Sequence, residues 1–310
     1  MSADLEARLE RVLDERYHHL HPFNLRMHAG ELSRDEIRTW VANRYYYQTR
    51  IPKKDGLIVT KADDPAFRRD WTRRIRDHEG EAGREGGLEL WLRLSEAVGL
   101  DREQVALCRD VLPGVRRACD AYVEFVASHD LLESVAASLT ERRAGAIMEV
   151  RIEAWEKHYS WVTTAGLAYF RNRTEQAPRD ASEGLAYVLG HVQSPADADG
   201  CCAALERKCE ILWSLLDAVE WGGRVPTLAP GMRLREDPEG GSLAVGAERA
   251  VRLNDTGREI LELCCDGRSV CEVGASFAAQ HATEAGASED AYAFLEAMES
   301  QRVIRCSHQA

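Results

Sequence analysis

Long apolar runs are missing from this 310-residue sequence, and none approaches the roughly 20 residues that a helix needs to cross a bilayer. The opening segment, MSADLEARLERVLDER, is charged throughout and does not resemble a secretory signal. Basic residues are also outnumbered, since 40 Lys and Arg face 52 Asp and Glu for a formal charge of −12. We therefore expect a cytoplasmic protein that binds neither membrane nor nucleic acid.

The sequence motifs of several common catalytic sites are absent as well. There is no glycine-rich nucleotide-binding loop, no G-x-S-x-G nucleophile motif and no H-E-x-x-H zinc motif. The nine cysteines form no C-x-x-C pair, which argues against a zinc ribbon or a thioredoxin-like site. A di-iron helical enzyme would need a pair of inward E-x-x-H motifs, and no such pair is present.

Helical periodicity dominates residues 1–222, and alternation typical of strands is not found there. One predicted helix begins at Ser33, where Glu36 completes a capping box. It is expected to end near Thr49, because Pro52 follows. These patterns predict an all-α bundle of about seven or more helices.

The pattern changes after Gly222-Gly223. Three short alternating runs, 232–236, 242–245 and 249–253, are typical of strands, and P-E-G-G between the first two predicts a hairpin turn. Helices are then expected from Asn254 to near Gly267, at 269–281 and at 288–301, with Ser288 opening the last, before a short strand at Val303-Ile304. The prediction is a helical domain at 1–223 followed by a small winged-helix-like α+β domain at 224–310.

One predicted helix carries a polar stripe. Trp40, Arg44 and Gln48 are spaced at i, i+4 and share a face, so the guanidinium and the amide would together hold a carboxylate. The alternative is structural: Tyr45 to Tyr47 pack a helix interface and Arg44 is solvated.

Further along the chain, Tyr169 and Arg173 are also i, i+4, and a phenol beside a guanidinium would stabilise an anion such as peroxide or an enolate. A surface stack of the two is the alternative. His78 sits at a predicted helix end, where it is either a general base or a cation that favours the helix C-terminus. Metal binding by the patch Tyr17-His18-His19-Leu20-His21 is left open. The patch lacks a helical pair of histidines at i, i+4, the spacing that would support it.

Several gapless blocks resemble the pyrroloquinoline-quinone (PQQ) synthase family, PqqC. They include HPFN, WVANRYYYQTRIPKKD, RRIRDHEGE, GGLELWLRLSEAVGL, AYFRNR and KCEILWSLLDA, and they cover essentially all of 10–221. Residues 225–310, with RVPTLAPGMRLRED and AERAVRLNDTGREIL, resemble PqqD, a small peptide-binding protein of the same pathway. The order of the two matches a known fused arrangement.

This resemblance implies a haem-oxygenase-like helical fold, often dimeric, so a homodimer is expected. It also implies the last step of PQQ biosynthesis, in which a bicyclic precursor is ring-closed and oxidised. Dioxygen is the oxidant, hydrogen peroxide is formed, and neither a metal nor an organic cofactor takes part. The C-terminal domain would bind the precursor peptide PqqA and present it to the radical enzyme PqqE, for instance by pairing an edge strand with the peptide.

Site residues follow from the resemblance by position. His78 is implied as the acid–base residue, and Tyr169 and Arg173 as the pair that handles oxygen and peroxide. The implied ligand-holding residues are Tyr17, His18, Arg44, Gln48, Lys54, Arg151 and Lys208, with Tyr122 and Glu141 in the pocket wall.

The sequence departs from the family pattern at one position. Many relatives have a His seven residues beyond the Glu that corresponds to Glu141, and here Met148 stands there. Because Met donates neither a proton nor a strong hydrogen bond, either that His is dispensable or the late oxidation steps of this chain are altered. The second case keeps an alternative open, a catalytically impaired homologue that acts as a peptide-binding scaffold.

Overall fold

The computed structural model describes residues 2–238, 240–247, 249–281 and 286–307. The chain divides into two compact units, each described by itself below. The helical unit comprises residues 1–108 and 114–217, and the mixed unit comprises residues 109–113 and 218–310. None of the helices among the described residues is both long and apolar enough to span a membrane.

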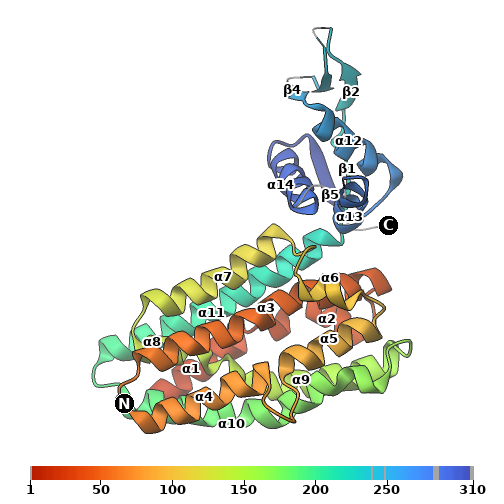
Figure 1. The fold of residues 1–310 in the computed structure, drawn as a ribbon. Helices are drawn as coiled ribbons and strands as arrows, with labels where there is room; N and C mark the ends of the chain where they lie inside the picture. Colours follow the sequence, from red (N-terminus) through yellow and green to blue (C-terminus); the bar gives the residue numbers. More distant parts are fainter. Residues whose placement is uncertain (1, 239, 248, 282–285, 308–310) are drawn as a thin grey trace. The chain divides into compact units, whose positions relative to one another are not determined.

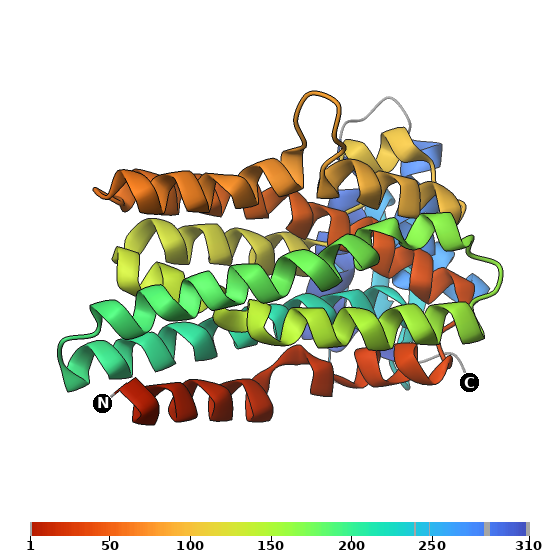
Figure 2. The same cartoon turned by 90° about the horizontal axis from the view of Figure 1, so that it is seen from below.

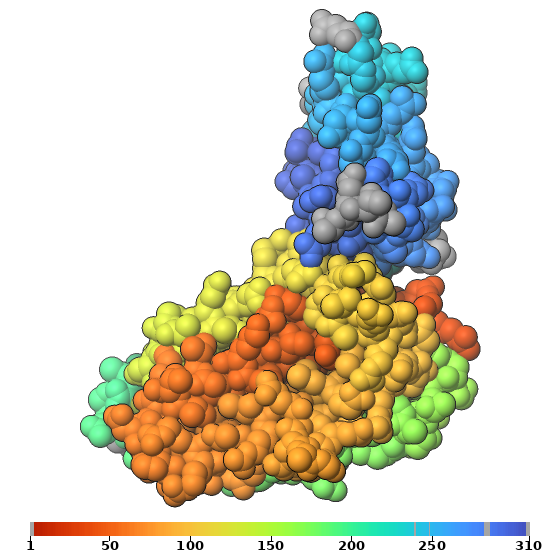
Figure 3. All heavy atoms as spheres, in the orientation of Figure 1, coloured from red at the N-terminus to blue at the C-terminus, as the bar shows by residue number. Residues whose placement is uncertain are grey.

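The helical unit is a bundle of long α-helices joined by short loops (Figures 1 and 2), as predicted. Its α-helices are α1 (Ser2–Arg16), α2 (Pro22–Ala29), α3 (Arg34–Lys61), α4 (Pro65–Glu79), α5 (Gly87–Ala97), α6 (Arg102–Ala106), α7 (Pro113–Ser128), α8 (Leu131–Ala137), α9 (Glu141–His158), α10 (Ala168–His191) and α11 (Pro195–Gly222). Single 3₁₀ turns lie at η1 (His18–Leu20), η2 (Ser138–Thr140) and η3 (Thr164–Leu167). Helices α4 and α5, in orange, cover much of the face seen in Figure 3.

The predicted end of α3 is wrong. Its start is confirmed, because the Ser33 hydroxyl accepts from the Glu36 N–H and the Glu36 carboxylate accepts from the Ser33 N–H. The helix does not stop near Thr49 but continues through Pro52 to Lys61. A proline removes one helical hydrogen bond, and here buried packing on both sides of it, by Ile51 and Ile58, outweighs that loss.

Large aromatic side chains fill the core of the bundle. The Trp40 ring centre lies 5.4 Å from that of Trp91 and 6.0 Å from that of Trp155, and all three indoles are almost fully buried. Trp91 also meets Tyr169 edge to face, with ring centres 4.7 Å apart. Such pairs contribute about 0.5–1.5 kcal/mol beyond the area they bury, and this one gives Tyr169 a rigid backing.

The mixed unit contains two small antiparallel sheets and three α-helices, which agrees with the predicted α+β class. Strands β2 (Arg233–Glu236), β3 (Ser242–Val245) and β4 (Ala250–Leu253) form a meander, while β1 (Val225–Leu228) pairs with β5 (Ile304–Ser307). The helices are α12 (Asp255–Leu263), α13 (Val270–Gln280) and α14 (Ala287–Ser300), with a 3₁₀ turn η4 (Cys264–Asp266) after α12.

Two details of this unit differ from the predictions, and one agrees. The hairpin turn is confirmed, since β2 and β3 pair with Glu236 opposite Ser242. Strand β1 was not predicted because Pro226 interrupts its pattern, although an edge strand accommodates a proline. Ser288 does not open α14, because Gly286, with a φ of 91°, occupies the N-cap position instead.

Candidate active site

A cavity of about 40 Å³ lies inside the helical unit. This volume has room for only one or two water molecules. Nine of the residues singled out in the sequence line it: Tyr17, His18, Arg44, Gln48, His78, Glu141, Met148, Tyr169 and Arg173. They come from the turn before α2 and from α3, α4, α9 and α10, so the fold brings together segments far apart in the sequence. The predicted pairs Arg44–Gln48 and Tyr169–Arg173 each present one helix face to the same space.

The other four candidates, Lys54, Tyr122, Arg151 and Lys208, are not among the residues that line this cavity. Lys54 is buried, with its Nζ 2.6 Å from Asp55 Oδ1 and 3.1 Å from Ser138 Oγ. The Tyr122 hydroxyl lies 3.3 Å from the same serine oxygen. Burial alone would lower the pKa of Lys54, but Asp55 and Tyr122 together outweigh it and the pKa is raised, so this lysine is charged.

Lys208 differs from Lys54 in its partners and in its protonation. Its Nζ lies 2.9 Å from the Tyr47 hydroxyl and 3.4 Å from the centre of the Tyr122 ring, and its side chain is buried. No carboxylate pairs with it among the described residues. Burial and the nearby Arg44 lower the pKa of Lys208 well below its usual range, so the approach of an anion would favour its protonation.

His78 has one ring nitrogen fixed by its own helix. Nδ1 lies 3.1 Å from the main-chain oxygen of Arg74, which accepts only, so Nδ1 carries the proton and Nε2 bears the lone pair. Burial, and then the neighbouring charge of Arg173, lower the pKa of His78. A neutral imidazole with a free Nε2 at the cavity wall is the form that a general base requires. Of the two interpretations of His78, the geometry therefore favours the base over a cation at the helix end.

Tyr169 is held at its hydroxyl and at its ring. The hydroxyl donates a hydrogen bond of 2.9 Å to Gln48 Oε1, and burial raises the pKa of the phenol, which keeps it protonated. A Cβ atom at Gly87 would lie only 3.2 Å from Cε2 of this ring, so a glycine there allows the close approach of α5. The Gly86-Gly87 pair in the sequence thus has a packing role beside the cavity.

Arg173 is anchored between two carboxylates. Its guanidinium donates to Glu141 at the cavity wall and, over 3.3 Å, to Asp180 Oδ2 behind it. Burial would lower the pKa of Arg173, but these acids outweigh it and the pKa is raised. Surface stacking, the alternative for Tyr169 and Arg173, does not describe these two residues, since both are buried.

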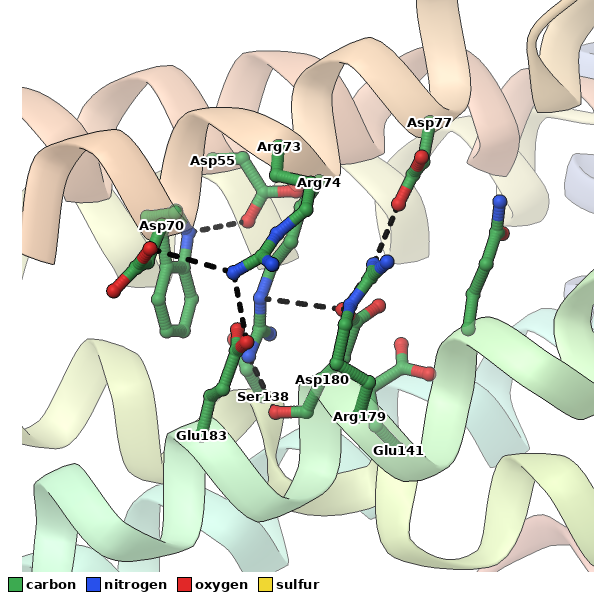
Figure 4. Close-up of polar contacts among 12 residues, drawn as sticks. Asp55, Asp70, Arg73, Arg74, Asp77, Ser138, Glu141, Arg179, Asp180 and Glu183 are labelled. Carbon is green, nitrogen blue, oxygen red and sulfur yellow. Dashed lines mark hydrogen bonds and ion pairs between the residues drawn. The ribbon is translucent and has the colours of Figure 1, made fainter.

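Asp180 belongs to a wider charged network that joins α10 to α4 (Figure 4). Arg74 donates to its main-chain oxygen, and Arg179 Nη2 lies 2.7 Å from its Oδ1. Arg179 also contacts Asp77 Oδ2 at 2.5 Å, next to His78 in α4. Sequence reasoning missed Asp180, although its distance of seven residues from Arg173, about two helical turns, indicates a shared face.

The histidines of the Tyr17–His21 patch do not act together. His21 Nδ1 accepts from the Phe23 N–H at the start of α2, and its Nε2 lies 3.2 Å from Asp217 Oδ1, so each of its ring nitrogens has a partner outside the cavity. A metal ion would need ligand atoms that lie close together. Within the described part of the chain, the possible ligand atoms of His18, His78 and Glu141 do not all lie within 4.8 Å of one another. The geometry does not favour a metal centre built from these three.

Comparison with known proteins identifies the family of each part of the chain. Residues 6–218 match the model of the TENA/THI-4/PQQC family, and residues 237–304 match that of coenzyme PQQ synthesis protein D (PqqD). The pyrroloquinoline-quinone synthase of Ruegeria pomeroyi is 46% identical over 227 residues, which cover 73% of this chain and 94% of that protein. That of Rhizobium rhizogenes is 47% identical over 225 residues, covering 73% and 91%.

Solved structures show the same fold at low sequence identity. A TenA homologue from Pseudomonas syringae pv. tomato superposes with a TM-score of 0.58 at 16% identity, covering 70% of this chain and 92% of its own. A domain with a haem-oxygenase-like fold from Shewanella denitrificans superposes with a TM-score of 0.56 at 15% identity, covering 70% and 89%. The haem-oxygenase-like fold expected for the helical unit is therefore confirmed.

Proposed function

Because the chain belongs to the TENA/THI-4/PQQC family and carries a C-terminal PqqD domain, we propose that it catalyses the final step of PQQ biosynthesis. In this step a bicyclic amino-carboxyethyl quinoline precursor is ring-closed and oxidised by dioxygen, with formation of hydrogen peroxide. Curated relatives with 46–47% identity are named pyrroloquinoline-quinone synthase. The observation that carries the proposal is one cavity that joins a histidine with a free Nε2, a protonated phenol and two guanidinium groups.

The charges around the cavity suit a substrate with several carboxylates. Arg44 faces the cavity and has no carboxylate or hydrogen-bond partner among the described residues. Behind the wall, Arg151 and Lys208 are buried, and the described part of the chain pairs neither with an acid. Burial and then the charge of Arg44 lower the pKa of Arg151 to about 9. An entering polyanion would therefore be stabilised by the two guanidinium groups, and by Lys208 once its approach favours protonation of that amine.

In the proposed mechanism, His78 Nε2 takes a proton from a carbon of the ring-closed substrate. The electron pair of that C–H bond enters the ring and leaves it as a quinol anion. This anion transfers two electrons to dioxygen, and one proton from its remaining hydroxyl and one from the His78 imidazolium complete hydrogen peroxide. The ring becomes the quinone, and neutral His78 is regenerated. Tyr169 and Arg173 stabilise the negative charge on the reduced oxygen.

The substrate's own redox system supplies the electrons, so the proposal includes neither a flavin nor iron. The cavity must also enlarge to admit a bicyclic ligand, since its volume is about 40 Å³. We therefore expect the surrounding helices to move on binding. Metal analysis of the purified protein, together with activity after chelation, tests the mechanism without iron. A stoichiometric metal whose removal abolishes activity would contradict it.

For the C-terminal domain, residues 224–310, we propose binding of the precursor peptide PqqA and its presentation to PqqE. Strands β2 and β4 are the edges of the three-stranded sheet and offer main-chain groups to an extended peptide. Titration of the full chain with a PqqA peptide tests this role. We also expect a homodimer, which sedimentation of the full chain would detect.

Oxygen uptake with the PQQ precursor tests the catalytic proposal directly. The full chain should consume dioxygen and release both PQQ and hydrogen peroxide. Met148 favours one competing function, the catalytically impaired scaffold, because it occupies the cavity wall without a strong hydrogen-bonding group. A folded chain that binds the PqqA peptide and consumes no oxygen with the precursor would support the scaffold and overturn the oxidase.

A further inference from the structure

Asn24, on α2, lies behind the cavity wall and is fully buried. Its Nδ2 is 2.8 Å from His18 Nδ1 and 2.7 Å from the His18 main-chain oxygen. Its Oδ1 is 3.1 Å from Arg151 Nη2. One amide therefore bridges a histidine of the cavity wall and a buried arginine of α9.

The chemistry of the three groups determines the direction of each hydrogen bond. A guanidinium has only donors, so the Asn24 atom that faces Arg151 is the carbonyl oxygen. The amide nitrogen then faces His18, and since it also only donates, His18 Nδ1 must accept. An accepting Nδ1 is unprotonated, and a neutral His18 therefore carries its proton on Nε2.

We propose that Asn24 is a positioning residue that sets the tautomer of His18, so that His18 Nε2–H donates a hydrogen bond to an anionic oxygen of the bound substrate. The inference rests on the proposed function for the identity of that oxygen. The tautomer itself does not depend on it.

The surroundings of His18 support this role. Its side chain is 4% exposed, and its second ring nitrogen has no hydrogen-bond partner among the described residues, although the ring lines the cavity. Burial, and then the charges of Arg44, Arg151 and Lys208, lower the pKa of His18 well below its usual range. The ring is therefore neutral in the empty site, and one hydrogen bond decides which nitrogen keeps the proton.

The cavity then contains two neutral histidines of opposite tautomer. The carbonyl of Arg74 makes His78 Nε2 an acceptor, while the amide of Asn24 makes His18 Nε2 a donor. The first can take a proton from the substrate and the second can hold the resulting anion. The same amide also orients Arg151, so one side chain aligns two groups implied in ligand binding.

Long-range ¹H–¹⁵N NMR of the full chain with ¹⁵N-labelled histidine, without substrate, tests the tautomer. His18→Gln assigns the signal. We expect an unprotonated Nδ1 and a protonated Nε2 in the unmodified protein; a protonated Nδ1 would overturn the inference whether or not any variant folds.

Substitution of Asn24 then tests the cause. Asn24→Asp has the same shape, but its carboxylate accepts from Arg151 and from His18, so Nδ1 should become protonated. Asn172→Asp, at an exposed position of α10, adds the same charge and should leave the His18 signal unchanged. A His18 Nδ1 that stays unprotonated in folded Asn24→Asp shows that another group sets the tautomer and refutes the role of Asn24.

Kinetics separate this inference from the proposed function. With the PQQ precursor, we expect Asn24→Asp to lower kcat/KM for oxygen uptake about 10–100-fold, the range found for residues that orient metal-binding histidines. An unchanged kcat/KM together with a switched tautomer would refute the donor role of His18. If the unmodified chain shows the expected tautomer and consumes no oxygen, the proposed function fails, and so does the donation to its substrate, while the tautomer assignment stands.

Discussion

The guanidinium of Arg44 lies 3.9 Å from the centre of the Tyr47 ring, one turn further along α3. Among the described residues, no hydrogen bond or ion pair accompanies this stacking. Six residues later, Arg50 stacks on Tyr46 at 3.7 Å in the same way, but its Nε also lies 2.7 Å from Asp120 Oδ1. The two arginines share a helix and a stacking mode and differ in whether an acid neutralises them, which makes them a matched pair.

The same substitution should weaken PQQ binding at Arg44 and leave it unchanged at Arg50. Arg44→Met should weaken PQQ binding about 10–100-fold, because a hydrogen bond to a charged group contributes about 1.5–3 kcal/mol. Arg50→Met should leave PQQ binding unchanged and cost at most about 1 kcal/mol of stability, because Asp120 is half exposed. Fluorescence titration with PQQ and urea unfolding measure the two quantities. Equal affinity losses in both variants would show that Arg44 does not contact the ligand.

His78→Ala predicts a loss in turnover that is larger than the loss in affinity. Removal of a general base lowers kcat about 10²–10⁴-fold. PQQ binding should change far less, because the proposed complex has other cavity residues that hold the carboxylates. Since burial lowers the pKa of His78 in the empty site, the base should stay active below pH 6.5, the usual His value, in the acid limb of kcat/KM. Oxygen-uptake kinetics and PQQ titration give both numbers, and equal losses would refute the assignment of His78 as the base.

Asp180→Asn should destabilise the helical unit. The substitution leaves Arg74, Arg173 and Arg179 around a neutral amide, and loss of one partner from a buried ionic network costs about 3–5 kcal/mol. Urea unfolding measures the change. Asp70→Asn is the control, because Asp70 also contacts an arginine but is 67% exposed, and a change near zero is expected. Similar losses in both variants would contradict the buried network.

Much of the fold could be predicted from local pattern. The capping box at Ser33, the hairpin between β2 and β3 and the change from helices to strands after residue 223 are signals within a few residues of one another. The errors at Pro52 and Pro226 have one cause: packing from distant segments overrides a local preference. Such packing is not visible in a window of ten residues.

The site was likewise predictable only where its residues are close in the sequence. Helical spacing predicts that Arg44 shares a face with Gln48, and Tyr169 with Arg173. It does not predict that Tyr169 contacts Gln48, because these residues are 121 positions apart. The contact of Asp180 with Arg173, behind the cavity wall, was missed because helical spacing alone does not show which residues of a face are paired.

Acid should destabilise the helical unit through its buried histidines. His18 and His78 both have lowered pKa values in the folded state, so the unfolded chain binds more protons once the pH falls below about 6.5. Stability is then lost with falling pH, by up to about 1.4 kcal/mol per pH unit for each histidine. Urea unfolding at pH 7.5 and 5.5 tests this. The double variant His18→Gln/His78→Gln should flatten the dependence, whereas His191→Gln, at the surface, should not; an equal slope in all three would contradict the prediction.

The resemblance implies a histidine at the position of Met148, and replacement of Met148 tests whether that difference matters. Its Sδ lies 3.8 Å from Arg151 Nη1 at the edge of the cavity. Met148→His would place an imidazole there that accepts from Arg151 and offers an N–H to the reduced oxygen, so we expect oxygen uptake about tenfold faster. Met148→Leu conserves volume and should change the rate less than twofold. Stopped-flow oxygen consumption compares the three proteins. An unchanged rate in folded Met148→His would mean that the missing histidine is dispensable, and that the groups already in the cavity protonate the oxygen without it.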